Sequence, residues 1–247
     1  MVERADRAPL STFYAPGAWS EQVELDEGAA HHASVKRLSV NDPVRLTSGD
    51  GRRAVGHIRE LSKKRFVVAL DASSVETIAQ PLQLEVWAPV GDRERMLMLA
   101  EKVVELGVSS WRPVIYRRSR SVTPRGEGEA FQQKVRLRQV NALEQCGSAW
   151  LPEMLPEATL DAALAGDAAH TSGSRLLLDA DGESLVALMG ELQAPVRVAL
   201  GPEGGLDEAE RDQFLRAGWR AVSLGANVLR FETAGIAAVA IVRAHFR

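Results

Sequence analysis

Two glycine-rich turns, each directly after a short apolar strand, constrain the fold of this chain more than any other feature. The strand predicted at 196–200 runs into Gly-Pro-Glu-Gly-Gly at 201–205, and the strand predicted at 219–224 runs into Gly225. Glycine adopts positive φ angles and lets the backbone approach a neighbour closely, so main-chain N–H groups in such turns can face a ligand. We therefore expect a ligand at the turns, with a tight turn that binds nothing as the alternative.

Start and stop signals surround these turns. Asp207 and Glu210 form a capping-box pattern, which predicts a helix over 208–217 that ends at Gly218. After the second turn, residues 233–242 predict a helix with small residues around most of its circumference. Small residues allow close packing, so we expect the C-terminal helix, 233–246, to form the interface of a homodimer.

Two common glycine motifs do not fit these turns. A phosphate loop of the Walker type ends in Gly-Lys-Ser/Thr, whereas Gly205 is followed by Leu206 and Asp207. A dinucleotide-binding turn opens a doubly wound sheet, whereas too few residues remain after Gly205 for the other strands of such a sheet. A different kind of ligand is expected.

Composition indicates an ordinary globular protein whose charges are unevenly distributed. The 247 residues are 45% hydrophobic and 26% charged, with a net charge of −3. Residues 36–65 and 112–138 each carry an excess of Lys and Arg, which predicts two polyanion-binding patches unless these side chains are merely scattered and solvated. A lone Cys146 fits a reducing cytoplasm, and the first residues lack the apolar core of a secretion signal. The five histidines show no metal-ligand spacing, so no metal is expected.

The two turns carry a family resemblance. Residues 200–205 (Leu-Gly-Pro-Glu-Gly-Gly) and 224–234 (Leu-Gly-x-x-Val-Leu-Arg-x-Glu-Thr-Ala) resemble the paired signature of the RsmE-type methyltransferases. This bacterial family methylates N3 of a uridine in small-subunit (16S) ribosomal RNA and belongs to the SPOUT superfamily. The resemblance implies an S-adenosylmethionine site in a trefoil-knotted α/β domain with a mainly parallel sheet, a homodimer, and 16S ribosomal RNA in the assembled small subunit as partner.

The resemblance spans nearly the whole chain and implies two domains, 1–74 and 75–247. Short strands predicted at 44–47, 53–61 and 65–70 indicate a small β domain at the start. Residues 31–42 resemble the family's PUA-like RNA-binding module, with Asn41 where the family has glycine.

In the second domain, strands predicted at 82–90, 111–116 and 175–179 alternate with helices, which favours a mainly parallel sheet. The first of these helices opens at Asp92 and ends at Gly107.

The resemblance also implies site residues. The cofactor-binding residues lie in the two turns, in the following helix and at the end of the strand near Leu178: Leu178, Leu200, Gly201, Pro202, Glu203, Gly204, Gly205, Leu224, Gly225, Asn227, Val228, Leu229 and Thr233. RNA contacts are expected from basic residues along both domains: Arg37, Arg52, Arg53, Lys63, Lys64, Arg95, Arg117, Arg118 and Arg120.

Methyl transfer from a sulfonium depends mainly on alignment of the acceptor in a dry site. Because uridine N3 carries a proton, some group must remove it or stabilise the anion that forms. We expect Arg230 to hold a uracil oxygen by a charge-assisted hydrogen bond. Glu203 or Glu232 is expected to act as a base or as a helix-end ligand, with a structural ion pair among these three residues as the alternative.

Two other functions stay open at this point. One is a SPOUT methyltransferase that acts on another ribosomal or transfer RNA nucleotide. The other is a non-catalytic RNA-binding or ribosome-assembly protein of the same fold, which is favoured by Ser148, where the family normally has an arginine. Binding of S-adenosylmethionine separates an enzyme from a binding protein, and mapping of the methylated nucleotide separates the two enzymes.

Overall fold

A computed structural model of the chain describes residues 10–121, 128–169 and 172–246. These residues form two compact units. The first contains the described residues up to Gln80 together with Leu143–Trp150, and the second contains those of Pro81–Ala142 and Leu151–Arg247. A short segment that follows much later in the sequence therefore belongs to the N-terminal unit.

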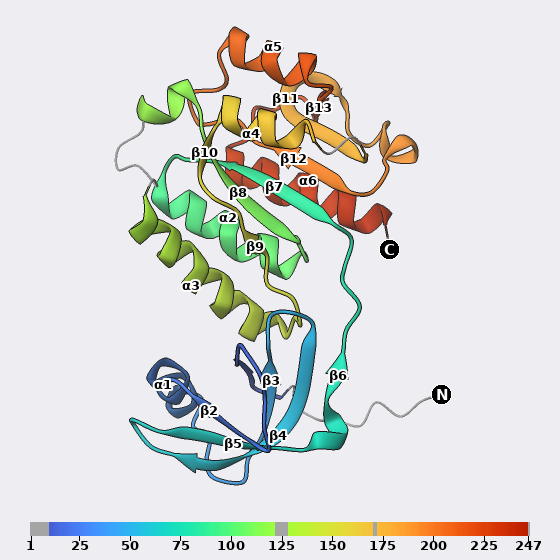
Figure 1. Cartoon of the computed structure of the whole chain (residues 1–247). Helices are drawn as coiled ribbons and strands as arrows, with labels where there is room; N and C mark the ends of the chain where they lie inside the picture. Colours follow the sequence, from blue (N-terminus) through green and yellow to red (C-terminus); the bar gives the residue numbers. More distant parts are fainter. Residues whose placement is uncertain (1–9, 122–127, 170–171, 247) are drawn as a thin grey trace. The chain divides into compact units, whose positions relative to one another are not determined.

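The first unit is a small curled sheet with one helix, α1 (Glu27–Val35) (Figure 1). Its strands are β1 (Thr12–Tyr14), β2 (Gln22–Leu25), β3 (Pro43–Thr47), β4 (Arg52–Leu61), β5 (Phe66–Leu70) and β6 (Glu76–Thr77). They are ordered β1-β3-β4-β5-β2, with β6 on β4. Only the β1–β3 pairing among these described strands is parallel. The fully buried rings of Phe13 and Phe66 meet edge to face at the centre of the core.

The loop after α1 turns through two residues in the left-handed region. Arg37 has a φ of 58° and Asn41 a φ of 75°. Asparagine tolerates this conformation better than most residues that carry a Cβ. Asn41 can therefore replace the glycine of the family pattern without a change of backbone conformation.

The second unit is a parallel sheet in the order β10-β8-β7-β12-β11-β13, with β9 paired to β8. Its strands are β7 (Leu84–Pro89), β8 (Ser110–Ile115), β9 (Glu153–Met154), β10 (Ala158–Thr159), β11 (Ser174–Ser184), β12 (Val196–Ala199) and β13 (Arg220–Ser223). Its helices are α2 (Arg93–Glu105), α3 (Glu129–Cys146), α4 (Leu160–Asp167), α5 (Glu208–Arg216) and α6 (Phe231–His245). Every pairing in this sheet is parallel. The predicted α/β architecture is confirmed, while the knot stays a prediction.

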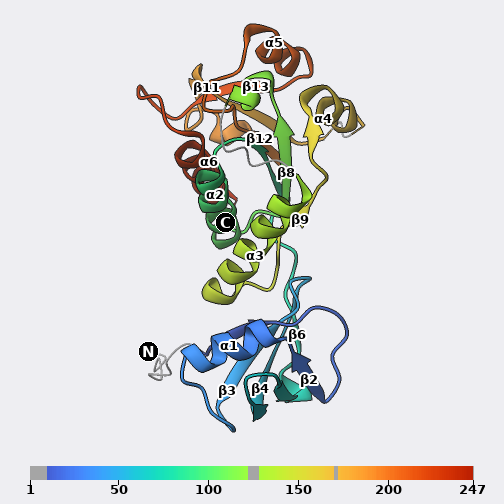
Figure 2. The same ribbon diagram turned by 90° about the vertical axis from the view of Figure 1, so that its left-hand side faces the viewer.

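Helices cover both faces of this sheet. Side chains of α2, α3 and α6 form one core with alternate sheet residues such as Val86 and Val198. Residues of α4 and α5 form the other with their neighbours Trp87 and Ala199. Figure 2 shows α2 and α6 on one side of the strands and α4 on the other. This arrangement leaves the carboxyl ends of the central strands to be closed by loops.

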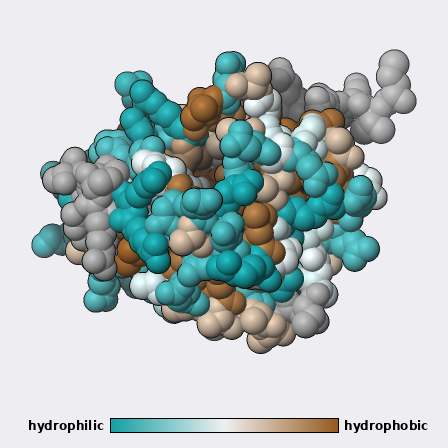
Figure 3. Space-filling model, turned by 90° about the horizontal axis from the view of Figure 1, so that it is seen from above, coloured by the Kyte–Doolittle hydropathy of each residue, from teal (hydrophilic) through white to brown (hydrophobic). Residues whose placement is uncertain are grey.

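Local signals place the start of α5 correctly, but not the start of α6. Asp207 caps α5, and both hydrogen bonds of the predicted capping box with Glu210 are present. The end of the molecule that carries α5 is covered mainly by hydrophilic residues, with small separate hydrophobic groups (Figure 3). The last helix begins at Phe231, two residues earlier than expected, because Phe231 is buried in the core and the extended Arg230 serves as N-cap.

Candidate functional site

A cavity of about 530 Å³ lies at the carboxyl ends of β11, β12 and β13. Three segments form most of its wall: the turn after β12, the turn after β13, and the residues from Leu178 onward in β11. Ligands of open parallel sheets bind at this edge, where the loops that leave the strands meet. Eleven of the thirteen residues expected to bind a cofactor line the cavity; Gly204 and Thr233 do not.

The turn after β12 depends on its glycines for two different reasons. Gly205 has a φ of 68°, a conformation that favours glycine. A Cβ added to Gly204 would lie 3.2 Å from Cβ of Arg118. Gly204 therefore makes room for an arginine behind the turn, which explains why it is absent from the cavity wall.

The turn after β13 presents backbone and apolar side chains. Gly225 has a φ of 140°, and its N–H donates to Oγ of Ser223 over 3.2 Å. Val228 lines the cavity and is 88% exposed. Thr233 lies beyond this turn in the first turn of α6 and is exposed.

The third wall is a bulge in β11. The strand pairs with β13 up to Leu178 and resumes at Glu183, so residues 179–182 leave the sheet. An added Cβ at Gly182 would lie 2.4 Å from the backbone nitrogen of Val222, so only glycine lets the bulge lie against β13. Asp179, Ala180 and Asp181 line the cavity from this bulge.

An arginine of α5 holds the bulge in place. Nε of Arg211 lies 2.5 Å from Oδ2 of Asp179, and the N–H of Asp181 donates to the other carboxylate oxygen of Asp179 over 3.0 Å. The Asp179 carboxylate raises the pKa of Arg211. Leu178 is the one residue of this wall that the sequence predicted; Asp179 and Asp181, a pair of acidic residues at the end of a parallel strand, are the signal for the rest.

The three residues expected to carry catalysis do not form one ion-paired group. Arg230 is exposed, lines the cavity and has no ion pair within the described part of the chain. Glu203 instead accepts a hydrogen bond of 3.0 Å from the N–H of Asp92, the N-cap residue of α2. Arg95 lies near both Glu203 and Glu232, at 3.8 and 3.9 Å. Glu203 thus lies at the N-terminus of α2, and its role in the site stays a prediction.

The arginines after β8 are bound to the first turn. Nη1 of Arg118 donates to the carbonyl oxygens of Gly204 and Leu206 over 2.8 and 3.3 Å. Arg117 forms an ion pair of 2.9 Å with Asp207. Together with the N–H of Glu210, the Arg117 guanidinium holds the pKa of Asp207 below its usual range. The side chain of Arg120 lies outside the described residues.

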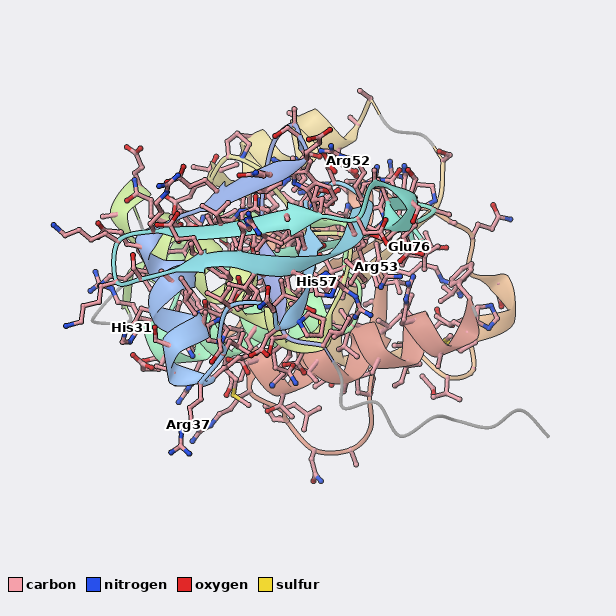
Figure 4. The ribbon with its side chains drawn as sticks, turned by 90° about the horizontal axis from the view of Figure 1, so that it is seen from below. His31, Arg37, Arg52, Arg53, His57 and Glu76 are labelled. Atoms are coloured by element: carbon pink, nitrogen blue, oxygen red, sulfur yellow. The ribbon has the colours of Figure 1, made fainter. Side chains whose placement is uncertain are left out.

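The RNA-binding residues predicted in the first unit fall into two groups, and Figure 4 labels Arg37, Arg52 and Arg53 among them. Arg52 is bonded to Asp50 and to the carbonyl oxygen of Gly17, and Arg53 is bonded to Glu76. Arg37, Lys63 and Lys64 are exposed and have no ion pair within the described residues. Arg37 projects outward near the end of α1 in Figure 4. The second group is therefore the better placed to meet a phosphate backbone.

The segment that departs from the family pattern has a structural role here. Ser148 stands where the family has an arginine, and its hydroxyl accepts a hydrogen bond from the N–H of Trp150 over 3.1 Å. The buried Glu144 accepts from the N–H of Tyr14 and faces Nδ1 of His32, at 2.8 and 2.9 Å. These contacts attach Leu143–Trp150 to the first unit.

None of the helices among the described residues is long and apolar enough to cross a membrane. No group of three or more His, Cys, Asp and Glu side chains in the same part of the chain is arranged to hold a metal ion.

Each of the two units contains a segment that matches a known protein family. Residues 79–243 match the RNA methyltransferase domain, and residues 25–71 match the RNA methyltransferase PUA domain. Among curated proteins, the chain is 25% identical to a ribosomal RNA small subunit methyltransferase E of Rickettsia conorii, over 94% of each chain. It is 28% identical to the protein of that name from Treponema pallidum, over 91% of this chain and 89% of that protein.

Solved structures are similar over nearly the full length. A methyltransferase of Legionella pneumophila in complex with bound SAM superposes with a TM-score of 0.82 at 26% identity, covering 96% of this chain and 98% of that one. A ribosomal RNA small subunit methyltransferase E of Neisseria gonorrhoeae, bound to S-adenosyl methionine, has a TM-score of 0.81 at 28% identity with the same coverage.

Proposed function

We propose that this chain, which belongs to the family of RNA methyltransferase domains, transfers the methyl group of S-adenosylmethionine to N3 of a specific uridine in 16S ribosomal RNA. The observation that carries the proposal is the cavity at the carboxyl ends of β11, β12 and β13, walled by both glycine turns. The acceptor base and the cofactor are expected to meet there.

The cavity suits S-adenosylmethionine in size and chemistry. Its volume of about 530 Å³ is within the range of small-molecule sites, about 300–1,000 Å³. Leu178, Leu200 and Leu224 offer apolar walls for an adenine ring, and the glycine turns expose main-chain groups for hydrogen bonds. When bound, the cofactor supplies an electrophilic methyl group on a sulfonium. The protein supplies the binding, the alignment and the exclusion of water.

Arg230 is proposed to act on the uracil. It lines the cavity, and no described carboxylate neutralises it, so its guanidinium is available to a developing negative charge. A positioned guanidinium stabilises the anion left when N3 loses its proton. Glu203 and Glu232 are assigned a supporting role, because their carboxylates face the N-cap of α2 and Arg95.

The first unit is proposed to bind the RNA backbone. The match of residues 25–71 to the PUA domain of RNA methyltransferases supports this role, as do the exposed Arg37, Lys63 and Lys64. Phosphate contacts of this kind orient the RNA but carry little sequence information. The assembled small subunit is the proposed substrate, and the cytoplasm, where ribosomal RNA is modified in bacteria, is the proposed location.

A homodimer built on α6 completes the proposal. One face of this helix packs within the chain: an added Cβ at Gly235 would lie 2.8 Å from Leu200 and 2.9 Å from Leu99. Ile236 and Ile241 remain partly exposed on the helix, and Val228 is 88% exposed nearby in sequence. An apolar surface of this kind is suited to a second copy. Sedimentation should show a dimer at micromolar concentration, and a monomer would remove this part of the proposal.

Two measurements test the function. Calorimetry should show binding of S-adenosylmethionine. Mass spectrometry of 16S ribosomal RNA from cells that lack the protein should show one uridine without an N3 methyl group. Incubation of small subunits from these cells with the purified enzyme and S-adenosylmethionine should add that methyl group. Loss of a different modification would point to another target nucleotide. Absence of cofactor binding would favour a non-catalytic RNA-binding protein.

A further inference from the structure

Arg95 stands at the junction of the elements that wall the cavity. It lies in the first turns of α2, lines the cavity, and has a side chain that is 30% exposed. Its Nη1 is 3.8 Å from Oε1 of Glu203, in the turn after β12. Its Nε is 3.9 Å from Oε1 of Glu232, in the first turn of α6. One guanidinium therefore faces two carboxylates from different elements.

Both carboxylates are withdrawn from solvent. The side chains of Glu203 and Glu232 are 16% and 7% exposed, and their Oε2 atoms are buried without a hydrogen-bond partner among the described residues. A buried carboxylate is costly unless a cation or donors compensate it. Within the described residues, Arg95 is the cation that lies within 4.0 Å of either one.

These contacts reach both glycine turns. Glu203 belongs to the first turn, and its Oε1 also accepts from the N–H of Asp92 at the start of α2. Glu232 lies two residues after Arg230, where the second turn passes into α6. Movement of Arg95 would therefore release one wall through Glu203 and the other through Glu232.

We propose that Arg95 is a positioning residue of the methyl-transfer site and not a contact to RNA. It fastens the first turn and the start of α6 to α2, and so keeps the cavity in the shape that receives the cofactor. This inference rests on the proposed function, because the affinity that it explains is the affinity for S-adenosylmethionine. It replaces the RNA-binding role that the sequence suggested for Arg95.

The test uses the full chain with Arg95→Met, which keeps the length of the side chain and removes its charge, and Arg95→Lys. Arg95→Met should raise the KM for S-adenosylmethionine about tenfold or more, while kcat at saturating cofactor changes by less than about threefold and RNA affinity is unchanged. Arg95→Lys should recover part of the affinity, because an ammonium keeps the charge and loses the fork. Arg216→Met, at an exposed arginine at the end of α5, is the matched control and should change nothing.

A double variant separates compensation of charge from general damage. Arg95→Met leaves both carboxylates without a cation. In Arg95→Met/Glu232→Gln, a neutral amide replaces one of these carboxylates, so part of the lost cofactor affinity should return.

Four outcomes distinguish a positioning role for Arg95 from the alternatives. Weaker RNA binding with an unchanged KM for the cofactor would make Arg95 an RNA contact and overturn the inference. A lower melting temperature with both constants unchanged would reduce Arg95 to a stability role and also overturn it. If the unmodified protein fails to bind S-adenosylmethionine in calorimetry, the proposed function itself fails, and the inference with it. If the unmodified protein binds and Arg95→Met binds equally well, only the inference fails.

Discussion

The carboxylate of Glu203 occupies the space that a side chain at position 91 would need. Oε2 of Glu203 lies 2.6 Å from a Cβ added to Gly91, and Oε1 lies 3.1 Å from it. A residue between β7 and α2 and a residue of the first glycine turn, far apart in the sequence, thus share one site. Gly91 does not have a positive φ, so its backbone conformation does not call for glycine. The constraint at this position is the nearby Glu203 carboxylate.

Gly91→Ala should therefore weaken cofactor binding, although Gly91 itself does not line the cavity. The methyl group would displace the Glu203 carboxylate from the N–H of Asp92 and from Arg95, and we expect the Kd for S-adenosylmethionine to rise about tenfold. Calorimetry measures this change. Gly190→Ala is the matched control, since an added Cβ at Gly190 meets nothing within 4 Å. Equal affinity of the two variants would show that the turn tolerates the displacement of Glu203.

Gly205→Ala tests the left-handed residue of the same turn. Gly205 has a φ of 68° and Gly218, at the end of α5, has a φ of 82°, so alanine at either position strains the backbone by about 1–2 kcal/mol. Both variants should lose similar thermal stability, but only Gly205→Ala should lose cofactor affinity, because the turn must move to relieve the strain. Calorimetry combined with thermal melting decides this. If Gly218→Ala weakens binding as much, the effect is general.

Arg230→Ala should reduce the rate of methyl transfer about a hundredfold, the scale that is lost with one oxyanion donor. Cofactor affinity and melting temperature should change little, because Arg230 has no ion pair among the described residues. Arg230→Lys should recover part of the rate, since the ammonium retains the charge and loses the planar fork. Single-turnover kinetics with small subunits is the measurement. A normal rate in the alanine variant would exclude Arg230 from the mechanism.

Lys63→Ala/Lys64→Ala should flatten the salt dependence of RNA binding. Two lost phosphate contacts would reduce the slope of log K against log salt by about 1.4–1.8 units. Arg52→Ala/Arg53→Ala is the contrasting variant: these arginines are paired with Asp50 and Glu76, so the expected effect is a lower melting temperature with a smaller change in slope. If the slope follows the arginines and not the lysines, the assignment of the two groups is reversed.

The cap of α5 should make stability depend on pH in the acid range. The N–H of Glu210, and then Arg117, lower the pKa of Asp207 below its ordinary value of 3.8. A group with a lowered folded pKa contributes stability that is complete above the unfolded value and is lost as pH falls through the folded value. Asp207→Asn keeps a good capping residue but does not titrate. Its melting temperature should therefore fall less steeply than that of the unmodified protein below about pH 4. Parallel melting curves would contradict this role of Asp207.

Much of the architecture is determined locally by the sequence. The capping box of Asp207 and Glu210, the glycine that ends α5, and the apolar strands before both turns are signals within a few residues of one another. They place the helices and strands of the second unit, and with them the edge of the sheet where the cavity lies. The start of α6 was predicted two residues late because burial of Phe231 in the core decides it.

The partners of the charged side chains were decided only by the tertiary structure. The sequence shows that Arg95 and Arg53 are basic and groups them with RNA contacts. The folded chain brings Arg53 within 4 Å of Glu76, and Arg95 within 4 Å of Glu203 and Glu232, all of them distant in the sequence. The sequence also does not predict the third wall of the cavity. Residues 179–182 form a bulge there because β11 pairs with β13 up to Leu178 and again from Glu183. Coulombic pairing and strand register depend on which distant segments become neighbours, and that is a property of the whole packed sheet, not of any local stretch.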